Sequence, residues 1–246
     1  MRVLPWALSL FASLLLGLGV GYWLGRESRA EPSPVDRPHP SIQFRDPSRL
    51  PFPTLIQESA GKEVRPLQPS RAADREILAT VSQLVEEAAS LFSQEDSPLR
   101  SLSRINEASR YFEDFLQRRL DELEDYSCVF PANAAGKTQR SGYPDLKLIH
   151  QPSGQVAYID PKLYALGSEE SSFRTFYYQP SHTTGKLHHH AHHLLIGIGH
   201  DGKDGQWTFL DWKIVDLYHL TLQRKTEYNA SNRELYQASA ILAERP

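Results

Sequence analysis

Two carboxylates and one amine occur in an order that can build a site for cutting phosphodiesters. Asp145 follows Pro144, and Asp160, Pro161 and Lys162 follow one another further along the chain. Carboxylate oxygens are the hard ligands that Mg²⁺ prefers, and a bound ion of this kind lowers the pKa of a coordinated water and neutralises charge that builds on a phosphate. An ammonium group beside them can contact that water or the phosphate. These residue types predict metal-assisted phosphodiester hydrolysis.

The segments around these residues are predicted to form a β-hairpin. Residues 146–149 form an alternating, extended stretch. Residues 150–154 form a polar turn with proline and glycine, and residues 155–159 form a second extended segment. A hairpin of this length returns Asp160 to the neighbourhood of Asp145. Because side chains alternate between the faces of a strand, Asp160 and Lys162 share one face while Pro161 points away.

This arrangement resembles the PD-(D/E)XK nucleases, the restriction-endonuclease-like superfamily. The family motif is Pro-Asp, a spacer with a hairpin, and then Asp or Glu, any residue, and Lys; the resemblance covers residues 126–236. It implies a restriction-endonuclease-like sheet and a Mg²⁺-dependent endonuclease acting on DNA, or as a second choice on RNA. It also implies that Asp145 and Asp160 hold the ion, that Pro161 lends it a carbonyl, and that Lys162 positions or activates water.

One residue departs from the family pattern, and the family suggests one more acid. The residue between Asp160 and Lys162 is usually apolar, whereas Pro161 lacks the N–H of other residues and is disfavoured in a central strand. In this family a helix before the first catalytic strand often brings a further carboxylate near the metal. The candidates in this chain are Glu113, Glu122 and Glu124.

Three cationic residues are predicted to contact the substrate. Lys137 and Arg140 belong to a loop that leads into Asp145, and Arg174 begins a predicted strand over residues 173–178. Arginine suits a phosphate because its planar fork makes two parallel contacts. An ion pair of Arg174 with a nearby glutamate is the competing interpretation. The histidine-rich run 188–193 is interpreted as a loop and a strand entry rather than as a metal site.

The overall charge limits how the chain can bind a polyanion. The formal net charge is -3, from 27 basic and 30 acidic residues, so any contact with nucleic acid must come from a local basic surface. A single cysteine, Cys128, excludes an internal disulfide. Two alternatives to a nuclease stay open: an inactive nucleic-acid-binding module on the same fold, and an interaction protein of the cell envelope.

An uncharged run at the N-terminus predicts attachment to a membrane. Residues 3–25 carry no charge, and a helix needs roughly 20 apolar residues to cross a bilayer. We therefore expect a single-pass membrane protein, and the excess of arginine after the run favours a cytoplasmic C-terminal domain. The competing interpretation is a signal within residues 1–30, cleaved after small residues, with export of the domain. Small residues at every fourth position of the run also predict a homodimer.

The rest of the chain divides into a tether and one domain. Residues 26–70 are rich in proline and are predicted to be a linker. Residues 71–246 are predicted to be the nuclease-like domain, which begins with two amphipathic helices within 71–125; the first spans roughly 72–93 and the second starts near Ser103. Helices followed by short strands predict an α+β or mixed α/β fold, with a small sheet against helices.

Overall fold

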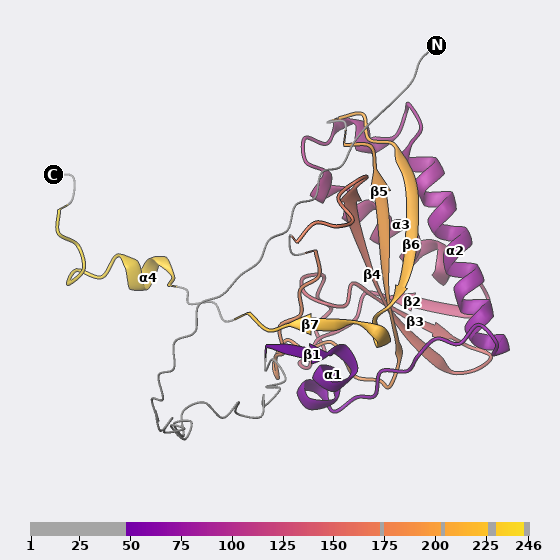
Figure 1. The fold of residues 1–246 in the computed structure, drawn as a ribbon, viewed down its shortest axis with the longest axis horizontal. Coiled ribbons are helices and arrows are strands. Elements are labelled where there is room, and N and C mark those ends of the chain that lie inside the picture. Colours follow the sequence, from indigo (N-terminus) through magenta and orange to yellow (C-terminus); the bar gives the residue numbers. More distant parts are fainter. Residues whose placement is uncertain (1–47, 173–174, 203–204, 226–229, 244–246) are drawn as a thin grey trace, which may run out of the picture. The chain divides into compact units, whose positions relative to one another are not determined.

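The computed structural model describes residues 48–172, 175–202, 205–225 and 230–243, all within a unit of residues 44–246. Figure 1 shows the order of the elements along the chain. The α-helices are α1 (Phe52–Ala60), α2 (Ala72–Phe92), α3 (Ser109–Asp121) and α4 (Asn232–Leu235), and the 3-10 helices are η2 (Pro98–Ser101), η3 (Ile105–Glu107) and η4 (Leu217–His219). The strands are β1 (Arg49–Pro51), β2 (Tyr126–Val129), β3 (Leu146–His150), β4 (Gln155–Ala165), β5 (His192–His200), β6 (Phe209–Asp216) and β7 (Thr221–Gln223).

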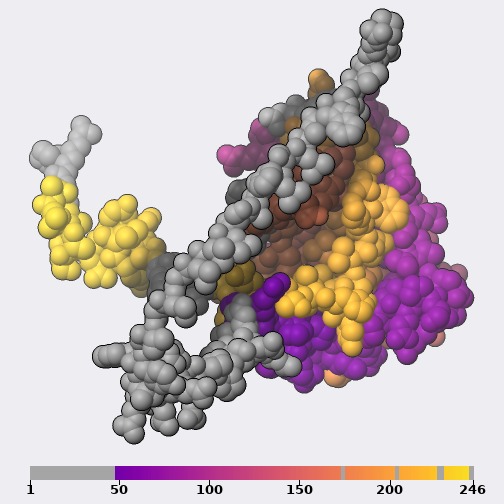
Figure 2. All heavy atoms as spheres, viewed as in Figure 1, coloured from indigo at the N-terminus to yellow at the C-terminus, as the bar shows by residue number. Residues whose placement is uncertain are grey.

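Five strands form the central sheet, in the order β2-β3-β4-β5-β6. β4 and β5 run parallel, and the other neighbours are antiparallel. β1 and β7 form a separate two-stranded sheet. A mixed sheet with helices confirms the expected α+β class, and the expected hairpin is present as β3 and β4 with its turn between His150 and Gln155. Orange atoms of the β6 region reach the surface in Figure 2.

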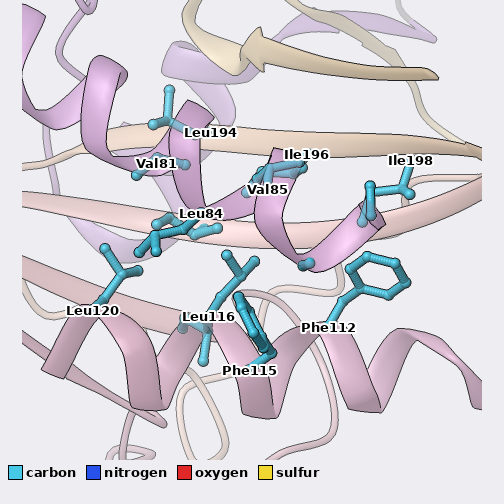
Figure 3. Close-up of a cluster of buried hydrophobic side chains, with 14 of the residues drawn as sticks. Val81, Leu84, Val85, Phe112, Phe115, Leu116, Leu120, Leu194, Ile196 and Ile198 are labelled. Atoms are coloured by element: carbon cyan, nitrogen blue, oxygen red, sulfur yellow. The ribbon is translucent and has the colours of Figure 1, made fainter. Parts of the chain in front are cut away.

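The helices α2 and α3 cover one face of this sheet. Their apolar side chains recur at three- and four-residue spacing, which places them along one stripe of each helix. Figure 3 shows these side chains pointing toward Leu194, Ile196 and Ile198 of β5. The sheet contributes alternate residues to this core, among them Ala157 and Ile159 of β4. Every second residue of β4 therefore faces the helices.

The intervening residues of β4 face the opposite side of the sheet. Val156 and Tyr158 belong to a second buried cluster, in which Phe52 and Ile56 come from α1. Asp160, Lys162 and Tyr164 continue the same alternation beyond this cluster. The face of the sheet opposite α2 and α3 is therefore apolar near the start of β4 and polar further along the strand.

Two boundaries differ from the prediction. Part of the expected linker 26–70 carries β1 and α1, because Pro51 ends an edge strand and Pro53 occupies the first turn of a helix, where proline is tolerated. The second long helix starts at Ser109, after two short 3-10 helices, and not near Ser103.

The expected strand over residues 173–178 is also wrong for its described part. Residues 175–178 have no regular structure. The Phe176 ring packs edge-on against Phe52 and Tyr143, at centroid distances of 5.9 and 5.1 Å. An aromatic residue that suits a strand therefore serves the second buried cluster instead.

Candidate active site

The register of the hairpin brings Asp145 and Asp160 together. Leu146 pairs with Ile159 in the antiparallel ladder, so continuing the register by one residue places Asp145 opposite Asp160. Leu146 and Ile159 both belong to the core under the helices, and side chains alternate along a strand. The two aspartates therefore lie on the same face, opposite that core.

The Lys162 ammonium joins the two carboxylates. Lys162 Nζ donates a hydrogen bond to Asp145 Oδ2 at 3.2 Å and lies 2.6 Å from Asp160 Oδ2. The second contact is a short ion pair with a carboxylate oxygen that is buried. Lys162 Nζ also donates to the carbonyl of Pro161 at 3.2 Å. The structure thus brings together all four residues that the motif predicted for the centre of the site.

Burial makes the charge on Asp160 costly. Only 2% of Asp160 is exposed, and burial, followed by the nearby Asp145 carboxylate, raises the pKa of Asp160 to about 7. Lys162 behaves differently. Burial lowers the pKa of this ammonium, but the Asp160 and Asp145 carboxylates outweigh burial and raise the pKa above its ordinary value. Lys162 is consequently a cation at neutral pH.

The donor set suits a hard divalent cation. Asp160 Oδ2 is a buried oxygen 2.6 Å from the Lys162 ammonium, and the Asp145 carboxylate lies across the ladder from it. Mg²⁺ is commonly held by one or two carboxylates together with waters and substrate phosphates. In the part of the chain that the structure describes, no group of three or more His, Cys, Asp and Glu side chains gathers around one point. Asp145 and Asp160 are the two carboxylates that the hairpin brings together here.

Pro161 is accommodated because the β3 ladder ends before it. The last pair of this ladder joins Leu146 to Ile159, two residues before Pro161, whereas the β5 ladder continues with Pro161 opposite Ile196. On the β3 side, no strand pairs with Pro161, so the missing proline N–H costs no ladder hydrogen bond there. The departure from the family pattern is thus compatible with the position of β4 in the sheet.

Of the three suggested glutamates, Glu113 adjoins the site. Its side chain is only 12% exposed, and burial, followed by the Asp145 carboxylate, raises the pKa of Glu113. Arg140 lies 3.6 Å from Glu113 Oε2, pairs with Asp114, and stacks on the Phe130 ring. Arg140 therefore lies next to the site, where it contacts Glu113 of α3.

The other suggested residues lie elsewhere. Glu122 pairs with Arg119 at 2.9 Å on the surface of the molecule, and Glu124 is exposed. Lys137 is an exposed residue of a turn, where its backbone N–H bonds Asn133 Oδ1 at 3.1 Å. Arg174 lies outside the described residues.

A second lysine near the site escaped the sequence analysis. Lys186 is 1% exposed, and its Nζ donates to the carbonyl of Gln139 at 3.2 Å. Burial lowers the pKa of Lys186, while Asp145, Asp160 and Glu113 oppose that shift, so the ammonium lies within electrostatic reach of all three acids. No sequence signal marks this lysine, because it belongs to a polar loop without periodicity.

The loop before Asp145 is held by a buried histidine. Tyr143 Oη and His193 Nδ1 are 2.7 Å apart, and the two rings stack at a centroid distance of 5.9 Å. Burial lowers the pKa of His193 to about 3, so this imidazole is neutral. The other histidines of the run bond separate partners, including the Ala132 carbonyl and Tyr158. The run acts as a loop and a strand entry, and His193 anchors the residue two positions before Asp145.

Comparison with known proteins assigns the chain to a family. A model described as the type II restriction enzyme MjaV family matches residues 46–239. The chain belongs to this family. The type II restriction enzyme MjaV of Methanocaldococcus jannaschii is 28% identical over 208 residues, which are 80% of this chain and 89% of that enzyme. No solved structure matches the chain. The MjaV family match includes β3, β4 and every described residue of the candidate site.

Membership of the MjaV family corrects the predicted membrane localisation. The chain belongs to a family of restriction enzymes, and among the described residues no helix is both long and apolar enough to span a bilayer. The prediction of a single-pass membrane protein is therefore wrong. The uncharged run 3–25, on which the anchor, the signal and the homodimer were predicted, lies outside the described residues.

Proposed function

We propose that this protein is a Mg²⁺-dependent DNA endonuclease of the PD-(D/E)XK type, with Asp145, Asp160 and Lys162 as its catalytic residues. The observation that carries the proposal is the convergence of two buried carboxylates and one ammonium on a single face of a β-hairpin. The MjaV family match supports DNA as the substrate. The mixed sheet, with its parallel β4–β5 pair, supports a restriction-endonuclease-like core.

Each residue has a distinct role in this proposal. Asp145 and Asp160 hold the metal ion, and the Pro161 carbonyl adjoins them. When bound, the ion supplies Lewis acidity and a water of lowered pKa. Lys162 is a cation at neutral pH, so it acts as a hydrogen-bond donor that orients the attacking water or the phosphate, and not as a general base. Fixed positive charge of this kind stabilises the anionic transition state of hydrolysis.

Cleavage of plasmid DNA tests the proposed activity. The purified full chain should nick or linearise supercoiled DNA in Mg²⁺ and should stop when a chelator is added. Since the recognised sequence is a property of each restriction enzyme, the substrate should be a mixture of genomic and plasmid DNA. Binding of this DNA without any cleavage would select the alternative of an inactive binding module.

Replacing Lys186 with methionine should slow cleavage on the order of 10- to 100-fold, because a buried cation near developing negative charge is lost. The variant should not be less stable, since methionine fills the space without a buried charge. Single-turnover cleavage and urea unfolding measure the two effects. Lys147→Met, on the neighbouring strand β3, is the matched control and should cleave at the wild-type rate. A destabilised Lys186→Met variant with normal cleavage would show that the role of Lys186 is structural.

A further inference from the structure

The register of the sheet places a second lysine in line with Lys162. Lys162 of β4 pairs with Gly197 of β5, and Gly197 pairs with Lys213 of β6. Residues paired across adjacent strands project from the same face, so both lysines stand on the face opposite α2 and α3. Two strand spacings separate them, about 10 Å. The position between them carries no side chain.

The next row across the sheet has the same pattern but a different use. Tyr164 pairs with Gly199, and Gly199 with Asp211. The Tyr164 ring lies across Gly199, where an added Cβ would come within 3.0 Å of Tyr164 Cζ and 2.9 Å of Leu166 Cδ2. Tyr164 Oη thereby reaches Asp211 Oδ2 at 2.6 Å. Packing of the tyrosine ring therefore requires Gly199.

Packing does not require Gly197 in the same way. An added Cβ at Gly197 would meet Tyr164 Cε1 at 3.4 Å, which is ordinary van der Waals contact. The Tyr164 ring therefore lies over the backbone at Gly197, between the two lysines.

Lys213 is held by two neighbouring side chains. Its Nζ donates to Tyr164 Oη at 2.6 Å and pairs with Asp211. The side chains of Lys213 and Asp211 are 52% and 40% exposed, so water and salt screen this pair. A phosphate can therefore compete with Asp211 for the ammonium.

We propose that Lys162 and Lys213 form a track for the sugar–phosphate backbone of duplex DNA, in which Lys213 contacts a phosphate that flanks the scissile one. The inference rests on the proposed nuclease function and extends it to a substrate-positioning residue on β6. Two cations aligned across the sheet suit two phosphates of one strand. The negative net charge of the chain makes such local cations necessary.

The salt dependence of DNA binding tests the track. Binding of a labelled random-sequence duplex to the full chain is measured with a chelator present, over a series of salt concentrations. Lys213→Gln should weaken binding about three- to tenfold and reduce the slope of log affinity against log salt by about one, as expected for one lost phosphate contact.

Arg118→Gln is the matched control. Arg118 is 65% exposed on α3, which covers the opposite face of the sheet, so this variant should keep the wild-type affinity and slope. The proposed track would be wrong if Lys213→Gln kept the wild-type salt slope, or if Arg118→Gln lost as much affinity and slope as Lys213→Gln. If the wild type cleaves DNA but Lys213→Gln keeps the full salt slope, only the proposed track is wrong. If the wild type binds DNA with the expected slope but never cleaves it, the proposed nuclease activity is wrong and the track stands.

Discussion

Asp160→Asn is expected to lower DNA cleavage in Mg²⁺ on the order of a thousandfold or more, because the variant loses one of two carboxylates available to the ion. The neutral amide keeps the shape of the side chain, so DNA binding in the presence of a chelator should change little. Single-turnover cleavage and equilibrium binding, measured on the same preparation, separate the two effects.

Asp125→Asn is a suitable control for this substitution. Asp125 is an exposed residue of the turn before β2 and lies outside the candidate site. The control should cleave DNA at the wild-type rate. Equal cleavage by Asp160→Asn and wild type would show that Asp160 holds no catalytic ion.

Asp160→Asn should also stabilise the metal-free protein relative to wild type, and increasingly so as the pH rises. The pKa of Asp160 is 3.8 before folding and about 7 in the folded protein, so between these values the native state keeps a proton that the unfolded state has lost. Stability from Asp160 is therefore present at pH 4 and is lost as the pH rises toward 7. Asparagine does not titrate. The free energy of unfolding of Asp160→Asn, relative to wild type, should increase on the order of 3 kcal/mol between pH 4 and pH 8.

Urea unfolding in a chelator, repeated across this pH range, measures the difference. Asp125→Asn again serves as the control, and its difference from wild type should not grow in this way. A difference between Asp160→Asn and wild type that stays flat, or that falls with rising pH, would mean that Lys162 keeps Asp160 ionised. In that case the carboxylate would not have the cost of burial that we assign to it. Such a cost is expected at a site shaped for function and not for stability.

The centre of the site could be predicted from the sequence because its geometry is local. Period-two alternation and a turn with proline and glycine are enough to put Asp160 and Lys162 on one face and to return the chain to Asp145. The helix α2 was predicted nearly to its ends for a similar reason, since its apolar spacing persists over many turns. These features depend on neighbours in the sequence.

The residues that the sequence did not reveal depend on distant contacts. Lys186 becomes part of the site only because its loop places it within reach of acids from α3, β4 and the segment before β3. Lys213 is aligned with Lys162 through the pairing of β5 with both neighbours, and strand order is not visible in one sequence. Helix α1 was hidden in a proline-rich segment, because Pro53 is compatible with the first helical turn.

The proposed cleavage requires a single divalent cation shared by Asp145 and Asp160. A crystal of the full chain soaked in Mn²⁺, with data collected for anomalous scattering, locates such an ion directly. We expect one strong peak within coordinating distance of a carboxylate oxygen of each aspartate, near Lys162 Nζ, and its loss in Asp160→Asn. A peak bound to other residues, or no peak at a Mn²⁺ concentration that supports cleavage, would contradict the account.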